Sequence, residues 1–214
     1  VHEAALPADL VKALKKAENE GERLHTAEKD GGDWNKALPF FKGALDLQRQ
    51  QAEIKQKGLG LATPYDALLD VYSPGQTTAD YDRLFNELEP FLKKLLPQVK
   101  KKQAGEAPPL PLQGPYDPAR TEKLCREMIA KIGFDANRGM IYFSDGHPES
   151  TGTPDDTRIS GCADVNNFMA PLYDMMHETG HGIYDQNTPK AWRHQPAGDA
   201  LGMDVHESQS LIWE

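Results

Sequence analysis

The sequence predicts a mainly α-helical protein with a small antiparallel β-sheet in its second half. Segments with apolar residues at helical spacing fill the first half of the chain, and glycine, proline and helix-capping residues separate them. The β-prone run Gly139–Ser144 follows, and Asp145–Gly146 is a turn signal directly after it. After a polar loop, Thr157–Ser160 alternates and is predicted to be a second strand.

Two regions are expected, a helical N-terminal region over residues 1–106 and a second region over residues 107–214. The proline-rich segment Ala107–Pro111 is predicted to be a stiff connector at their boundary. The predicted helices of the first region, with their caps and end residues, cover residues 9–29, 33–60, 64–72 and 78–102. In the second region, Asp117 is expected to cap a helix that Gly133 closes.

Composition indicates a soluble globular protein, because charged residues make up 27% and hydrophobic residues 38% of 214. The net charge of −9 argues against a nucleic-acid partner, and no apolar run approaches the length of a membrane span. Cys125 and Cys162 are far apart and outside C-x-x-C spacing. We expect both to be reduced thiols, which suits a cytoplasmic protein.

His177-Glu178-Thr179-Gly180-His181 is the most informative stretch, because it spells H-E-x-x-H. On a helix, residues four apart share one face, so both imidazoles can reach one metal ion. The residues before it have near-helical apolar spacing, and Asn166–Asn167 can cap this helix. This pattern is typical of zinc metallopeptidases in which the glutamate, here Glu178, is the general base. It therefore predicts a helical metallopeptidase architecture with the β-sheet beside the motif helix.

A catalytic zinc site needs three protein ligands and one open position. Glu207, 26 residues after His181, is the candidate third ligand. Gly180 and Gly182 leave room for a close backbone approach to the motif helix. Zinc is the expected metal, although histidine and carboxylate ligands also accept cobalt or manganese.

The chain strongly resembles the carboxypeptidase Taq family of metallocarboxypeptidases in two longer motifs. These are residues 177–186 and His206-Glu207-Ser208-Gln209-Ser210 with the residues to Glu214. The resemblance extends to Asp156–Ser160, similar to the family's D-x-R-x-T element with serine for threonine, to His147–Pro148, and to the helical segment from Pro64. It covers the chain from about Trp34 to Glu214. It implies Glu207 as the third metal ligand, removal of C-terminal residues from peptides, and a homodimeric full-length protein.

Family members resembling this chain are about twice as long, and later family motifs (I-R-x-x-A-D and G-Y-x-x-Y) are absent here. The sequence is therefore expected to be a partial chain of a longer peptidase. The predicted function is a metal-dependent carboxypeptidase that acts on peptides by zinc-activated water attack. A zinc endopeptidase or oligopeptidase is one alternative, and a non-catalytic helical fragment with an incomplete site is another.

Several further residues have two possible roles. His206 is either a donor to the oxyanion or an outward-facing helical histidine. Arg158 either steers a substrate carboxylate or braces its loop through Asp156, and bracing is the favoured role. Asp185 and Asp204 are either acceptors for the N–H groups of the ligand imidazoles or solvated side chains, and the solvated position is favoured for each. An edge strand containing Ile159 is hypothesised to pair with an extended peptide substrate.

Overall fold

The computed structural model describes residues 6–27, 33–144 and 147–214. The chain divides into two compact units, Val1–Lys94 and Leu95–Glu214, and their boundary falls within the long helix α4 (Thr78–Ala104). The regional boundary expected at residues 106/107 stays a prediction. The mainly helical fold class is confirmed by the order of elements, in which helices predominate and one small sheet lies in the second half of the chain.

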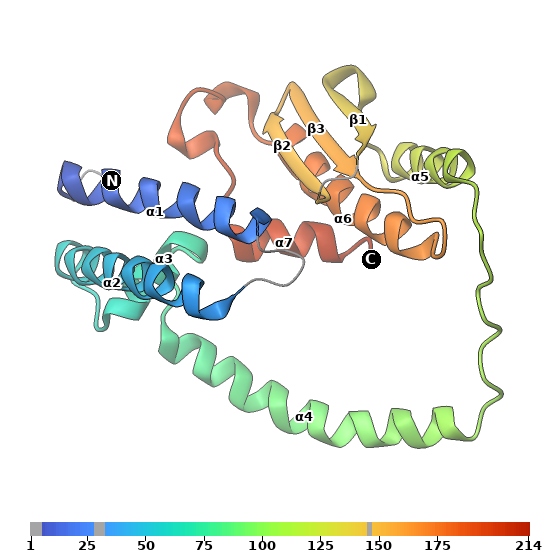
Figure 1. Cartoon of the computed structure of the whole chain (residues 1–214), viewed down its shortest axis with the longest axis horizontal. Coiled ribbons are helices and arrows are strands. Elements are labelled where there is room, and N and C mark those ends of the chain that lie inside the picture. The colour runs from blue at the N-terminus through green and yellow to red at the C-terminus, as the bar shows by residue number, and fades with distance from the viewer. Residues whose placement is uncertain (1–5, 28–32, 145–146) are drawn as a thin grey trace. The chain divides into compact units, whose positions relative to one another are not determined.

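The first unit consists of α1 (Ala8–Ala27), α2 (Trp34–Leu59), α3 (Pro64–Tyr72) and the first part of α4. Helix α2 packs against both α1 and α3 (Figure 1). The predicted caps of α2 are confirmed, because the Asp33 side chain accepts from Asn35 N and Gly60 ends the helix at φ 66°. The predicted break at residues 30–32 lies outside the described residues.

The start of α4 differs by one residue from the prediction. Thr78 was expected to cap the helix, but it is the first helical residue, and the Thr77 backbone N–H and hydroxyl both donate to Asp80. The Thr78 backbone N–H and hydroxyl donate instead to Asp66, at 2.8 Å each. Asp66 also forms a capping box with Thr63 at the start of α3, so this buried carboxylate joins two helix starts.

The second unit packs two helices against a three-stranded sheet. Its regular elements are α5 (Pro118–Ile132), β1 (Gly139–Phe143), β2 (Glu149–Thr153), β3 (Asp156–Gly161), α6 (Met169–Gln186) and α7 (Met203–Leu211). Short 3-10 helices cover Ala136–Arg138, Lys190–Trp192 and Pro196–Gly198. Buried apolar side chains of α5, of the loop that follows it, of the sheet and of α6 form its core: Cys125, Ile129, Phe134, Ile159 and Met175.

The sheet is mixed, which corrects the predicted antiparallel sheet. Strand β3 lies in the centre, parallel to β1 and antiparallel to β2. The segment expected to be a polar loop contains β2, whose sequence Glu-Ser-Thr-Gly-Thr is polar because this edge strand is largely exposed. Strand β2 runs opposite to β1 and turns tightly into β3. The chain thus reverses direction a second time, and β3 runs parallel to β1. The edge-strand hypothesis for Ile159 is therefore wrong, because this buried residue is paired on both sides.

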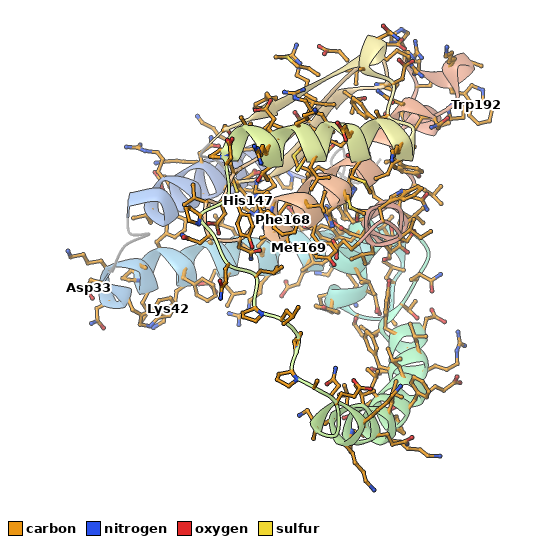
Figure 2. All side chains as sticks on the ribbon, turned by 90° about the vertical axis from the view of Figure 1, so that its right-hand side faces the viewer. Asp33, Lys42, His147, Phe168, Met169 and Trp192 are labelled. Atoms are coloured by element: carbon orange, nitrogen blue, oxygen red, sulfur yellow. The ribbon has the colours of Figure 1, made fainter. Side chains whose placement is uncertain are left out.

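Helix α6 carries the H-E-x-x-H motif and lies between the sheet and α7 (Figure 1). Its N-cap residue is Phe168, one residue later than predicted, and the side chain of the preceding Asn167 accepts from Met169 N and Ala170 N. Phe168, labelled beside Met169 in Figure 2, packs edge-on against Tyr116 with ring centroids 5.0 Å apart. Among the described helices, none has the length and apolar character needed to cross a membrane.

Candidate metal centre

Two histidines of the motif turn toward each other on one face of α6. His181 Nε2 lies 3.1 Å from His177 Nε2, and the two rings stand nearly edge to face with centroids 4.8 Å apart. The four-residue spacing produces this pairing, because 3.6 residues make one helical turn. Both Nε2 atoms therefore point toward one position beside the helix.

Glu207 of α7 brings a carboxylate oxygen to the same position. Its Oε2 atom lies 3.5 Å from His177 Nε2 and 3.5 Å from His181 Nε2. Each of the three side chains offers one donor atom within 4.8 Å of the others. A tetrahedral zinc ion with bonds of about 2.0–2.2 Å needs its ligand atoms roughly 3.3–3.5 Å apart. The nearly equilateral triangle of two imidazole nitrogens and one carboxylate oxygen fits that requirement.

Glycines allow the neighbouring elements to approach α6 on nearly opposite faces. A Cβ on Gly180 would come within 2.5 Å of Ser210 Cα on α7. A Cβ on Gly182 would meet Phe134 at 3.0 Å and the β3 residue Ile159 at 3.2 Å. The expectation of close backbone approach at both glycines is thereby confirmed. Without side chains at these positions, α7 and the sheet can both contact the motif helix.

The last serine of the H-E-S-Q-S motif supports the third candidate ligand. Ser210 is fully buried, and its hydroxyl donates to the Glu207 backbone carbonyl at 2.7 Å and to Glu207 Oε2 at 3.2 Å. One oxygen of the Glu207 carboxylate therefore has a partner on its own helix, which limits the directions in which it can point.

The outward-facing nitrogens of both motif imidazoles also have partners. His177 Nδ1 lies 2.5 Å from Glu214 Oε1, and His181 Nδ1 contacts His206 Nδ1. His206 Nε2 lies 3.3 Å from Asp185 Oδ1. The contact of Glu214 with His177 was not predicted from the sequence. Its only signal was the place of Glu214, seven residues after Glu207 in the motif that resembles the family.

Burial shifts the ionisation of the central groups. It raises the pKa of the Glu178 carboxyl, although the nearby His177 and His147 favour its charged form. Burial is also the main cause of the lowered pKa of His181, and His206 adds to it. Asp185 has a raised pKa for the same reason, partly offset by His206. A largely neutral His181 is the form that has a free lone pair for a metal.

His147, labelled in Figure 2, contributes to the family resemblance, but the sequence predicted no electrostatic role for it. It favours the charged forms of Asp174 and Glu178, so it stands near the middle of α6. The His147–Pro148 pair in the sequence was the available signal.

The remaining predicted residues fall into two groups. His206 turns toward α6, so the outward-facing alternative is wrong, and both of its ring nitrogens already have partners.

Asp156 and Arg158 form a two-contact ion pair at 3.1 and 2.7 Å, and both side chains are exposed. Arg158 alternates with the buried Thr157 and Ile159, which places it on the sheet face opposite α6 and its histidines. This geometry favours the bracing role.

Comparison with known protein families matches residues 1–214 to the family described as carboxypeptidase Taq (M32) metallopeptidase. Thermostable carboxypeptidase 1 of Thermus thermophilus is 33% identical over 223 residues, which cover 98% of this chain and 42% of that protein. Metallocarboxypeptidase 1 of Trypanosoma cruzi is 31% identical with a TM-score of 0.86, over 98% of this chain and 42% of that one. The Pyrococcus furiosus carboxypeptidase structure is 27% identical with a TM-score of 0.84, over the same shares.

The chain thus spans about 42% of the length of these relatives. The family description implies a divalent metal, and the His177, His181 and Glu207 triangle is a group that can hold one. From the match over its whole length, together with the fold and the site, the chain belongs to the carboxypeptidase Taq (M32) metallopeptidase family.

Proposed function

We propose that this chain carries the metal centre of a metal-dependent carboxypeptidase that releases C-terminal amino acids from peptides. His177, His181 and Glu207 hold one zinc ion, and Glu178 is the general base. The observation that carries this proposal is the triangle of donor atoms, with sides of 3.1, 3.5 and 3.5 Å. Cobalt or manganese could occupy the same ligands.

Zinc bound there supplies Lewis acidity, which acidifies a water molecule and polarises the scissile carbonyl. Glu178 is buried and adjoins His177 on α6, so its carboxylate can accept the proton of the attacking water. It then delivers this proton to the departing amine. The three protein ligands leave one position open for water and substrate.

The choice of a carboxypeptidase over an endopeptidase rests on the family and on relatives with carboxypeptidase names. Since the chain spans 42% of those relatives, we propose that it is part of a longer peptidase whose other residues help to bind the substrate. We also propose a homodimer for the longer protein, as the family resemblance implies. A cytoplasmic location accords with the free thiols of Cys125 and Cys162.

The test is digestion of one synthetic peptide, with a free or an amidated C-terminus, by the zinc-loaded longer protein that contains this chain, read by mass spectrometry. The proposal predicts stepwise loss of single C-terminal residues from the free peptide only, and no loss with Glu178→Gln. Internal cleavage of both peptides would replace the carboxypeptidase by the endopeptidase alternative. No cleavage of either peptide by the zinc-loaded longer protein would overturn the proposal.

A further inference from the structure

His206 is held tightly between two aromatic rings rather than left in solvent. Its ring centroid lies 4.5 Å from that of His181 and 4.9 Å from that of Tyr184, which meets it nearly at a right angle. The Tyr184 hydroxyl in turn accepts from Leu201 N at 3.1 Å. These contacts fix the plane of the His206 imidazole, and with it the directions of its two nitrogens.

The contacts of His181 and His206 are compatible with one arrangement of protons. His181 Nε2 faces His177 and Glu207, so a metal there requires its lone pair on Nε2 and its hydrogen on Nδ1. His181 Nδ1–H then donates to His206 Nδ1, which must be the acceptor. The hydrogen of His206 is consequently on Nε2, where it donates to Asp185 Oδ1 at 3.3 Å. The opposite tautomer of His206 would place two N–H groups face to face.

We propose that Asp185 and His206 are positioning residues that hold His181 in its Nδ1–H tautomer, with the Nε2 lone pair directed at the metal position. This inference rests on the proposed metal site and adds two residues to it. Partners of metal-bound histidines typically change metal affinity by about 10–100-fold when removed. The pair acts through His181 and touches neither metal nor substrate.

The placement of the two residues gives α7 a double role. Asp185 follows His181 by four residues, so both lie on the same face of α6. His206 directly precedes Glu207 on α7. One helix therefore supplies the third ligand and also the residue that orients the second ligand, and docking of α7 completes both parts of the site together.

The test uses two pairs of variants. His206→Leu and Asp185→Leu each remove a hydrogen-bonding partner. His206→Gln and Asp185→Asn keep one, because an amide oxygen can accept and an amide N–H can donate. Asp204→Leu is the matched control: among the described contacts this exposed carboxylate accepts only from Val205 N and from neither ligand imidazole, so the acceptor role considered for it has no support. Zinc affinity is measured by chelator competition.

The leucine variants should bind zinc about 10–100-fold more weakly, the amide variants should recover most of that loss, and the control should match wild type. Equal affinity of wild type and both leucine variants would overturn the proposal. An equal loss of zinc affinity in the leucine and amide variants would also overturn the proposal, because a general disturbance of packing would then explain the loss.

A second readout needs no metal. Long-range ¹H–¹⁵N NMR of the metal-free chain, at about pH 8.5 where imidazole is ordinarily neutral, reports the tautomer of each histidine. We expect Nδ1–H for His181 and Nε2–H for His206, with His181 shifting toward Nε2–H in His206→Leu. An Nε2–H His181 in wild type would overturn the proposal. Failure of the wild-type chain to bind zinc, with the expected tautomers present, would instead contradict the proposed metal site alone.

Discussion

Gly180 of α6 lies directly against Ser210 of α7, so that a Cβ on the glycine would come within 2.5 Å of the serine Cα and would also meet the Gln209 carbonyl oxygen. These obstacles are backbone atoms, which cannot turn aside as a long side chain can. The separation of α6 and α7 therefore depends on the missing side chain at Gly180. Glu207 stands on the same helix as Ser210, three residues earlier, and reaches both histidines at this separation.

Gly180→Ala should push α7 away from α6 and weaken zinc binding, although alanine is the better helix former. Overpacking of this kind typically costs about 1–3 kcal/mol, and we expect a loss of zinc affinity of roughly 5–150-fold with a lower unfolding temperature. Gly43→Ala in α2 is the matched control, because nothing lies within 4 Å of the position that its new methyl group would take. That variant should gain about 0.5–1 kcal/mol of stability. Unchanged zinc affinity in Gly180→Ala would contradict the close approach.

The two thiols should react at very different rates. Cys125 is fully buried, and burial raises the pKa of its thiol to about 11, so its thiolate fraction near neutral pH is very small. Cys162 is partly exposed. A disulfide reagent added to the native chain should modify one thiol quickly, and Cys162→Ser should abolish this fast reaction. A fast reaction that survives in Cys162→Ser would show that Cys125 is accessible.

Asp66 should make the first unit sensitive to acid. Hydrogen bonds, first of all from the Thr78 backbone N–H, lower the pKa of this buried carboxyl below its ordinary value of 3.8. A lowered folded-state pKa stabilises the fold at pH values above the unfolded pKa, and this stabilisation is lost as the pH falls through the folded pKa.

Asp66→Asn should therefore unfold at a lower temperature than wild type near neutral pH, and the gap should narrow as the pH falls below about 4. Thermal unfolding followed by circular dichroism across this range measures both effects. Asp82→Asn on the exposed surface of α4 is the control, with an expected effect within about 0.5 kcal/mol. A gap that stays constant down to acid pH would exclude the charge of Asp66 as its cause.

Ile159 should be a main contributor to the stability of the second unit. It is fully buried on the central strand and packs toward α6. Ile159→Ala should cost about 2–5 kcal/mol of unfolding free energy by loss of burial and creation of a cavity. Met140→Ala, on the edge strand β1 and 55% exposed, should cost much less. Similar losses for both variants in denaturant unfolding would argue against the described core.

Local chemistry explains which parts of the fold were predictable from the sequence. Caps and spacing predicted α2 and α6, because Asp33 and Asn167 act within their own helix ends. The mixed sheet was not predictable, since β2 is polar and its pairing depends on a turn and on the central strand. The four-residue spacing of His177 and His181 identifies one face of one helix. The contact of His206 with His181, by contrast, depends on how α7 docks through Gly180, which no local pattern specifies.

Zinc stoichiometry shows whether His177, His181 and Glu207 form one metal centre. The purified 214-residue chain and its Glu207→Ala variant are dialysed against zinc, freed of unbound metal and measured by elemental analysis. We expect about one zinc per wild-type chain and little or none in Glu207→Ala, since two imidazoles alone make a weak site. An absence of zinc in the wild type, or equal zinc in both proteins, would contradict a preformed His177, His181 and Glu207 metal centre.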